Sequence, residues 1–189
     1  MIIRGEKVFL RPIRPSDFPK LAAWSRDGEI ARYVGGQYPT RLEEYAEWHR
    51  RLQSDRHSHH LAISTHDDVL IGHIELDHIA WRSGDAELRI RIGEKSFWDQ
   101  GYGTDAVRTL VEYAFRSMRL SRVYLRVFTS NVRAIRCYEK VGFRKEGRLT
   151  RPGPDGRLAT ILLMRITRAD LAARRRGGRR DPRAEAKAG

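Results

Sequence analysis

The chain has 189 residues, and its 37 Lys and Arg residues against 24 Asp and Glu residues give a formal charge of +13. A hydrophobic fraction of 40% excludes a wholly disordered chain, and no run of about 18 apolar residues would cross a membrane as a helix. The length is that of one ordinary domain. A single cysteine and an N-terminus without a long apolar segment predict a cytoplasmic protein with no membrane contact.

The first half of the chain predicts short helices and four strands. Residues 18–25, after a capping Ser16 or Asp17, predict a helix, and apolar residues every three to four positions predict another over 42–52. The segment 31–39 contains two glycines and a proline and predicts a loop. The predicted strands are residues 7–12, 61–64, 69–76 and 85–92.

The second half has the clearest periodicity, which predicts a long helix after Gly103. Its apolar face is formed by Val107, Leu110, Val111, Ala114, Phe115 and Met118. A strand over 123–128 follows. The next helix is predicted to begin at an N-cap, Ser130 or Asn131, and to end at Gly142.

The chain closes with a predicted hairpin and a basic tail. Residues 143–150 and 158–166 flank a Gly-Pro-Asp-Gly turn and complete a mixed sheet, so we predict one α/β (α+β) domain over residues 1–170. Residues 171–189 have little to bury and predict a disordered tail. Because residues 165–189 hold nine basic and three acidic residues, this tail is predicted to be a solvated terminus or a weak contact to nucleic acid or the ribosome.

A glycine-containing loop, Gln100-Gly101-Tyr102-Gly103-Thr104, precedes the long helix. Glycines let backbone N–H groups face an anion, and the helix start adds unpaired N–H groups and a partial positive charge. Both a pyrophosphate site and a purely structural loop are consistent with this pattern. A nicotinamide or flavin site is disfavoured, because the eight residues 93–100 separate the strand from the first glycine of the loop and no acid follows at the spacing that holds a ribose.

Two segments carry a family resemblance. Residues Ala86–Gly93, with the glycine loop and the helix after it, resemble motif A of the GNAT acyl-CoA N-acyltransferase superfamily. Residues Asn131–Phe143, which end in Tyr-Glu-Lys-Val-Gly-Phe, resemble its motif B. The opening Val8–Ile13, followed by Ser-Asp-Phe, is similar to the RimJ/RimL-like branch, which contains protein N-terminal acetyltransferases. The resemblance covers residues 6–167.

The resemblance implies a single GNAT-like domain and a coenzyme. Its sheet is mixed and mostly antiparallel, with flanking helices and central strands that splay apart to admit the pantetheine arm of acetyl-CoA. The implied coenzyme-binding residues are Ile90, Arg91 and Ile92 on the splayed strand, Gln100, Gly101, Tyr102, Gly103 and Thr104 at the pyrophosphate, and Asn131 beside the pantetheine. Asp105 departs from the family's Gly or Ala, but in the first helical turn its side chain can point away from a phosphate.

Transfer of an acetyl group from a thioester to an amine involves two proton movements. A phenol with a pKa near 10 can lend a proton to a thiolate, a role implied for Tyr138; the alternative is a buried aromatic whose hydroxyl is satisfied elsewhere. Glu87 is the candidate base, and its alternative is an exposed acid paired with Arg89 or Arg91. The second choices for the base are Glu75 and His73. An N-terminal α-amine, with a pKa near 7.7 to 8.0, needs no dedicated base.

Two other groups suggest chemistry that we do not expect here. The run His57-Ser58-His59-His60 is similar to a metal-binding tract, but no acid or cysteine stands at ligand spacing, so no metal is predicted. Cys137 offers a thiol for a covalent intermediate. A role as a small apolar residue on a helix is favoured, because direct transfer needs no acyl-enzyme.

The predicted function is an acetyl-CoA-dependent N-acetyltransferase that moves an acetyl group directly to a primary amine of a small molecule or a peptide. A protein N-terminal α-amine is the first choice of acceptor, since a strongly basic protein is a poor host for a polyamine. A polyamine or an antibiotic amine is the alternative acceptor. A non-catalytic acyl-CoA-binding or RNA-binding protein is the alternative of another class. No feature of the sequence indicates an oligomeric state.

Overall fold

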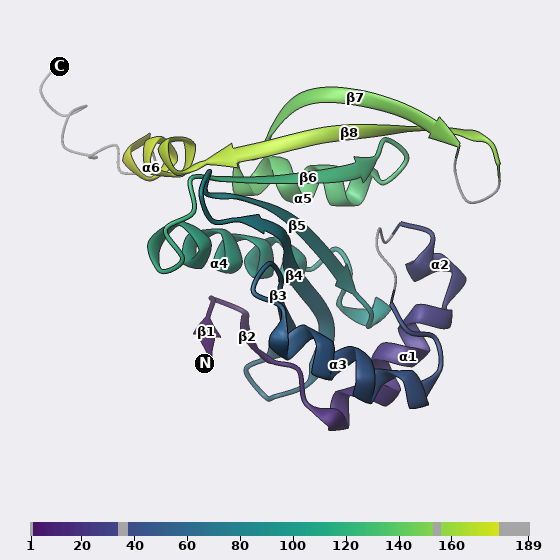
Figure 1. The fold of residues 1–189 in the computed structure, drawn as a ribbon. Helices are drawn as coiled ribbons and strands as arrows, with labels where there is room; N and C mark the ends of the chain where they lie inside the picture. Colours follow the sequence, from purple (N-terminus) through teal and green to yellow (C-terminus); the bar gives the residue numbers. More distant parts are fainter. Residues whose placement is uncertain (1, 34–37, 153–155, 178–189) are drawn as a thin grey trace, which may run out of the picture.

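The computed structural model describes residues 2–33, 38–152 and 156–177, which form an eight-stranded sheet with helices packed on it (Figure 1). The strands are β1 (Ile3–Arg4), β2 (Val8–Pro12), β3 (His59–Thr65), β4 (Leu70–Ala80), β5 (Asp85–Ile92), β6 (Arg122–Phe128), β7 (Arg144–Pro152) and β8 (Leu158–Thr167). Their order in the sheet is β1-β2-β3-β4-β5-β6-β8-β7. Paired strands run antiparallel except β5 and β6, which are parallel. The predicted mixed, mostly antiparallel sheet is confirmed.

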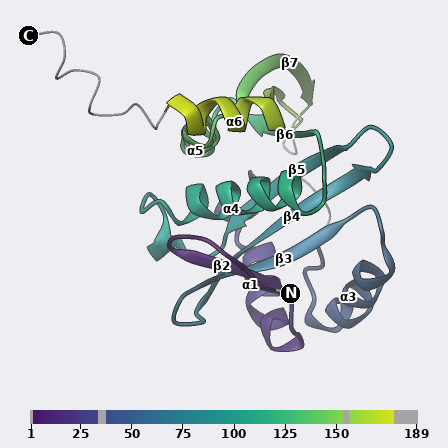
Figure 2. The same ribbon diagram turned by 90° about the vertical axis from the view of Figure 1, so that its left-hand side faces the viewer.

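Helices cover both faces of this sheet. They are α1 (Phe18–Arg26), α2 (Gly28–Ala31), α3 (Tyr45–Ser54), α4 (Tyr102–Arg116), α5 (Val132–Val141) and α6 (Arg168–Gly177), with 3₁₀ turns η1 (Pro15–Asp17), η2 (Leu42–Glu44) and η3 (Lys95–Phe97). Figure 2 shows α4 on one side of the sheet and α1 and α3 on the other. Among the described helices, none has the length and apolar character needed to cross a membrane. Most of the predicted turn at 153–156, and residues 34–37 of the predicted loop, lie outside the described residues.

Alternate strand positions supply two hydrophobic clusters, one on each face of the sheet. Leu61 and Ile63 belong to the cluster that packs with α4, whereas Ala62 between them belongs to the cluster beneath α1 and α3. The predicted apolar stripe of α4 is buried in the first cluster through Val107, Leu110, Val111, Ala114 and Phe115. The second cluster is built mainly from Phe18, Leu21, Trp24, Tyr45 and Trp48.

The two parallel strands separate partway along their length. β5 and β6 pair only over Asp85–Glu87 and Arg122–Tyr124. β5 nevertheless continues against β4 to Ile92, and β6 continues against β8 to Phe128. Beyond Glu87, the edge of β5 that faces β6 is therefore free of ladder partners in the described sheet, so its N–H and C=O groups can serve a ligand. The predicted splaying of the central strands is confirmed.

Asp105 ties the first turn of α4 to the start of the chain. Its buried carboxylate accepts backbone hydrogen bonds from the N–H groups of Glu6 (3.2 Å), Lys7 (2.8 Å) and Val8 (3.1 Å). An added Cβ at Gly5 would lie 2.5 Å from a carboxylate oxygen of Asp105, so glycine is required for this approach. The acid therefore points away from the glycine loop and fixes the β1–β2 hairpin to the helix that carries that loop.

The chain after residue 170 differs from the prediction. Residues 171–177 continue α6 and are helical rather than disordered, while residues 178–189 lie outside the described residues. A reciprocal cap explains the helix: Thr167 Oγ1 accepts from the N–H of Asp170 (3.1 Å), and the Asp170 carboxylate accepts from the N–H of Thr167 (3.0 Å). Leu171 also packs against the main cluster, which gives the helix an apolar contact.

Candidate active site

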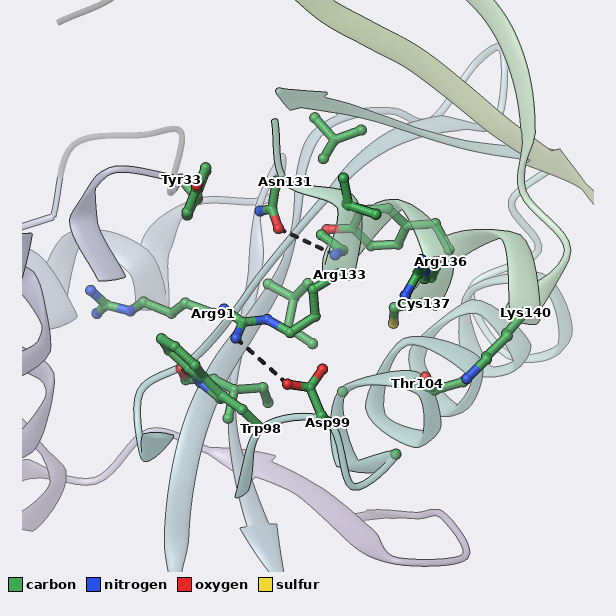
Figure 3. Close-up of a pocket in the computed structure, with 18 of the residues that line it drawn as sticks. Tyr33, Arg91, Trp98, Asp99, Thr104, Asn131, Arg133, Arg136, Cys137 and Lys140 are labelled. Atoms are coloured by element: carbon green, nitrogen blue, oxygen red, sulfur yellow. Dashed lines mark hydrogen bonds and ion pairs between the residues drawn. The ribbon is translucent and has the colours of Figure 1, made fainter. Parts of the chain in front are cut away.

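A cleft of about 380 Å³ lies between the splayed strands β5 and β6, the first turn of α4, α5 and α2 (Figure 3). Eight of the predicted site residues line it: Ile90, Arg91, Ile92, Gly101, Gly103, Thr104, Asn131 and Tyr138. The other three, Gln100, Tyr102 and Glu87, do not line it. The structure thus brings most of the predicted residues, from three separate segments of the chain, to one cavity.

The glycine loop has a backbone suited to an anion. Gly101 caps α4 in the left-handed region, with φ of +85°, which L side chains rarely adopt. The first N–H groups of α4 lack partners within the helix, and the partial positive charge of the helix N-terminus lies at the cleft. A Cβ added at Gly103 would meet only Ile92 Cγ1, at 3.6 Å, so the protein's own packing does not require this glycine. The residues present therefore fit a bound pyrophosphate, since Gly103 leaves space in the wall.

Two loop residues support this backbone from outside the cleft. The Tyr102 ring packs edge-on against Phe97, and the Lys7 ammonium lies 5.3 Å from its centroid. Lys7 Nζ also donates to the Gln100 carbonyl at 2.9 Å, while the Gln100 side-chain amide donates to the Ser96 carbonyl. Lys7 is a neighbour of the loop that the sequence did not reveal, because 93 residues separate it from Gln100.

Cations outnumber acids on the walls of the cleft. The described lining includes the cations Arg91, Arg126, Arg133, Arg136 and Lys140 and the acids Glu29 and Asp99. Arg133, Arg136 and Lys140 all come from α5, at helical spacings of three and four, which places them on one side of the helix. That spacing was a sequence signal for a phosphate-facing surface. The cleft is therefore electrostatically suited to an anionic ligand.

Arg133 bridges the mouth of the cleft in Figure 3. Its guanidinium lies 3.7 Å from the centroid of the Trp98 ring, and its Nη1 is 4.0 Å from Asp99 Oδ2. Trp98 is held in turn by its indole N–H, which donates to the Ile92 carbonyl at 2.8 Å. The loop after β5 and the start of α5 are thereby linked across the cleft.

Two neighbouring side chains of α5, Tyr138 and Cys137, both stay protonated. Burial raises the pKa of the Tyr138 phenol well above its ordinary value, with a smaller contribution from Cys137, and its ring packs against Phe143. The phenol makes no hydrogen bond to another described residue, which leaves its proton for a ligand. Burial also raises the pKa of the Cys137 thiol, which disfavours a thiolate nucleophile.

Asn131 is the N-cap of α5, as the sequence predicted. Its Oδ1 accepts from the backbone N–H of Ala134 at 3.2 Å. Because the oxygen is used by the helix, the side-chain amide N–H₂ is the part that is left for a ligand in the cleft.

The predicted base, Glu87, lies in a dense ion-pair network instead of the cleft. Its carboxylate is buried and accepts two hydrogen bonds from Arg126, both 2.8 Å, and one from Arg89 at 3.0 Å. His78 Nδ1 lies 3.3 Å from the same group. Burial by itself would raise the pKa of Glu87, but the two guanidinium groups outweigh it and hold the pKa below its ordinary value. Of the two predicted roles, this geometry favours the paired acid, but the acid is buried rather than exposed, and its partners are Arg89 and Arg126 rather than Arg91.

The second-choice bases belong to a polar stripe on the sheet face beneath α1 and α3. Cross-strand pairs place His73 opposite Arg91 and Glu75 opposite Arg89. The pKa of His73 lies well below its ordinary value, mainly because the side chain is buried and to a smaller extent because of the charges of His60 and Arg91. Neither His73 nor Glu75 lines the cleft. The structure also brings His60 from β3 against both residues, a contact that the sequence did not predict.

Arg91 links this stripe to the cleft. Its side chain is buried and extends toward α1 in Figure 3, where Nη1 donates to Ser25 Oγ at 2.9 Å. The guanidinium lies 4.3 Å from the centroid of the Tyr38 ring. Within the described residues it has no acidic partner, and its buried Nε and Nη2 donate no hydrogen bond.

Relatives of known description are N-acetyltransferases. A probable N-acetyltransferase, YjcK, of Bacillus subtilis (strain 168) is 29% identical over 157 residues, which cover 77% of this chain and 85% of that protein. An aminoglycoside N(6')-acetyltransferase type 1 of Klebsiella pneumoniae is 46% identical over 56 residues, which cover 29% of this chain and 28% of that protein.

Solved structures share the fold. The spermidine N-acetyltransferase of Vibrio cholerae, in complex with CoA and spermine, superimposes with a TM-score of 0.80 at 23% identity, covering 88% of this chain and 98% of that one. Residues 7–144 match the acetyltransferase (GNAT) domain family. With the splayed strands, the glycine loop and the cleft between them, this match shows that the chain belongs to the GNAT acetyltransferase family and is an N-acetyltransferase.

Proposed function

We propose that the enzyme uses acetyl-CoA as its acyl donor and acetylates the α-amine of a peptide or protein N-terminus, as in the RimJ/RimL-like branch. The cationic cleft, the space left by Gly103 and the CoA complex of the structural neighbour support the donor. The phosphates would be held by the backbone N–H groups of Gly101–Thr104 and by the cations of α5, with the pantetheine arm along β5 between Ile90 and Ile92.

The acids that line the cleft bear on which amine can be the acceptor. Among the described residues, both acids that line it are ion-paired: Glu29 Oε2 is 2.7 Å from Lys95 Nζ, and Asp99 Oδ2 is 4.0 Å from Arg133 Nη1. A polycationic acceptor would therefore meet no free carboxylate, and a lysine-like amine would meet no free base. An α-amine with a pKa of about 7.7 to 8.0 is partly neutral at physiological pH and needs neither.

Bound acetyl-CoA would supply an acetyl thioester, from which the acetyl group passes to the amine nitrogen. The free backbone N–H groups of β5 would stabilise the charge that develops on the carbonyl oxygen. Tyr138 would donate its phenolic proton to the departing sulfur, a role supported by its position in the cleft wall, and its raised pKa keeps the phenol protonated before the transfer. The amine would lose its proton to solvent or to the phenolate that results.

An antibiotic amine is the second candidate acceptor, because of the 46% identity to the aminoglycoside acetyltransferase. That identity covers 29% of this chain, so it bears on one part of the fold only. A polyamine is supported by the structural neighbour, whose 23% identity shows the shared fold alone.

The test is thiol release from acetyl-CoA with four acceptors: a peptide with a free N-terminus, the same peptide with a blocked N-terminus, spermidine and an aminoglycoside. We expect kcat/KM to be highest for the free peptide and transfer to be absent with the blocked one. Higher kcat/KM for spermidine or the aminoglycoside would replace the proposed acceptor. Saturable coenzyme binding without turnover on any amine would indicate the non-catalytic alternative.

A further inference from the structure

Three metal-ligating side chains meet on the polar face of the sheet, outside the cleft. His60 comes from β3, and His73 and Glu75 come from β4, where a spacing of two residues puts both on one face. His60 Nδ1 lies 2.9 Å from Glu75 Oε2 and 3.2 Å from His73 Nε2, and the third side of the triangle, His73 Nε2 to Glu75 Oε2, is 3.7 Å.

The surroundings of the three atoms leave one of them unsatisfied. The Glu75 and His73 side chains are 2% and 1% exposed, and that of His60 is 11% exposed. Glu75 Oε1 accepts from Arg89 Nη1 at 3.3 Å, and the Tyr38 phenol also reaches the Glu75 carboxylate. The buried Oε2 lies 2.9 Å from His60 Nδ1 but has no hydrogen bond of regular geometry from the described residues. A buried carboxylate oxygen in that state is costly, and a cation would satisfy it.

We propose that His60, His73 and Glu75 bind a divalent transition-metal ion, Zn²⁺, which holds β3 to β4. In a tetrahedral zinc site with bonds of about 2.0–2.2 Å, neighbouring ligand atoms stand about 3.3–3.5 Å apart. The three observed distances lie on either side of that value. Two imidazoles and a carboxylate form a ligand set that zinc commonly takes, and the Arg89 hydrogen bond to the second carboxylate oxygen orients Glu75.

Two guanidinium groups lie on the same sheet face as the three ligand atoms, and that of Arg91 has no acidic partner among the described residues. Arg89 also contacts Asp77 (2.8 Å) and Glu87 (3.0 Å), so its charge is compensated independently of Glu75. Arg91 is the second guanidinium on this face, and the Tyr38 ring lies over it. None of the three ligand residues lines the cleft, so the ion would have a structural role rather than a part in acetyl transfer.

The test uses the untagged full chain, stripped with a chelator, dialysed, and then given Zn²⁺ or Co²⁺. We expect one zinc ion per chain by elemental analysis, and a tetrahedral Co²⁺ absorption band. His60→Gln, whose side chain is nearest to solvent, and Glu75→Gln should each weaken binding by at least about tenfold. The matched controls His57→Gln and His66→Gln, outside the cluster, should bind as the wild type does.

Three outcomes would overturn the proposal: no stoichiometric zinc on the wild-type chain, unchanged binding by His60→Gln, or loss of binding in His57→Gln, which would assign the ion to the sequence tract. Circular dichroism of each variant separates loss of the ion from loss of the fold. If Glu75→Gln does not fold, the zinc affinity of His60→Gln alone tests the proposal. Because zinc content is read without turnover, this result is independent of the proposed acetyl transfer.

Discussion

At the scale of single residues, the structure places two titratable side chains in environments that push their pKa values in opposite directions. Tyr138 is buried without a charged partner in the described chain, so its phenol keeps its proton. Glu87 is buried among Arg126, Arg89 and His78, so its carboxylate stays charged. A group that keeps its proton can donate one to a leaving thiolate, whereas a carboxylate held by two guanidinium groups is a weak base.

Tyr138→Phe should therefore lower kcat by at least about tenfold, because the proton for the leaving sulfur is lost, while coenzyme affinity changes little. The matched control is Tyr124→Phe, since Tyr124 lies on β6 but does not line the cleft. Steady-state kinetics and calorimetric titration with CoA measure the two effects. An unchanged kcat in Tyr138→Phe would leave Tyr138 as a packing residue only.

Glu87→Gln should lower the free energy of unfolding by about 2 kcal/mol at pH 7, because charged hydrogen bonds to Arg126 and Arg89 are lost and Arg126 is only partly screened by solvent. The folded-state pKa of Glu87 lies below its ordinary value of 4.5, so its stabilisation is present above pH 4.5 and disappears as the pH falls through the folded value. Urea unfolding at several pH values measures this difference, with the exposed Glu146→Gln as the control.

The same variant separates the two predicted roles of Glu87. Because the ion-paired carboxylate is unsuited to accept a proton, the acidic limb of the pH–rate profile should be retained in Glu87→Gln. Loss of that limb with unchanged stability would restore Glu87 as the base.

At the scale of elements, the start of α4 has to serve both the helix and a ligand. Gly103→Ala should raise stability by about 0.5–1 kcal/mol, since alanine favours a helix and meets only Ile92 at 3.6 Å. The same methyl group occupies space in the cleft wall, so CoA affinity should fall at least tenfold. Gly147→Ala, whose added Cβ also meets one side chain at 3.6 Å, is the control away from the cleft. Unchanged affinity in Gly103→Ala would contradict a phosphate at this position.

The cap of α6 allows a second test of an element. Thr167→Ala removes the side chain that pairs with Asp170, so about 1 kcal/mol of stability should be lost. Hydrogen exchange should speed up over residues 168–177, whereas the exposed Thr150→Ala should leave it unchanged. Exchange in α6 that does not respond to the variant would show that packing of Leu171, rather than the cap, holds the helix.

The long elements could be predicted because their signals are local. α4 follows from an apolar stripe over about three turns, and α5 from an N-cap at Asn131 and a glycine at 142 with φ of +119°. β1 and α2 have two and four residues, too few for any periodicity. α6 was missed because its Arg-rich composition suggested disorder, while its stability comes from the local cap and the contact of Leu171 with a distant core.

At the scale of the whole molecule, the parts of the site that lie near each other in sequence were predictable and the parts that meet across strands were not. The glycine loop and the α5 residues stand in contiguous motifs. Three contacts depend on how distant segments are placed by the sheet, which a single sequence does not fix. They are the contact of Lys7 with Gln100, that of Arg126 with Glu87 and that of His60 with Glu75. The predicted contact of residues 171–189 with nucleic acid or the ribosome stays a prediction.

The central claim is that the cleft between the splayed strands holds the coenzyme with its phosphates at the glycine loop and its sulfur at Tyr138. A crystal structure of the enzyme with CoA tests it most directly. We predict pyrophosphate oxygens on the backbone N–H groups of Gly101–Thr104 and the sulfur within hydrogen-bonding distance of the Tyr138 hydroxyl. A pyrophosphate bound elsewhere, or a sulfur out of reach of that hydroxyl, would contradict the account.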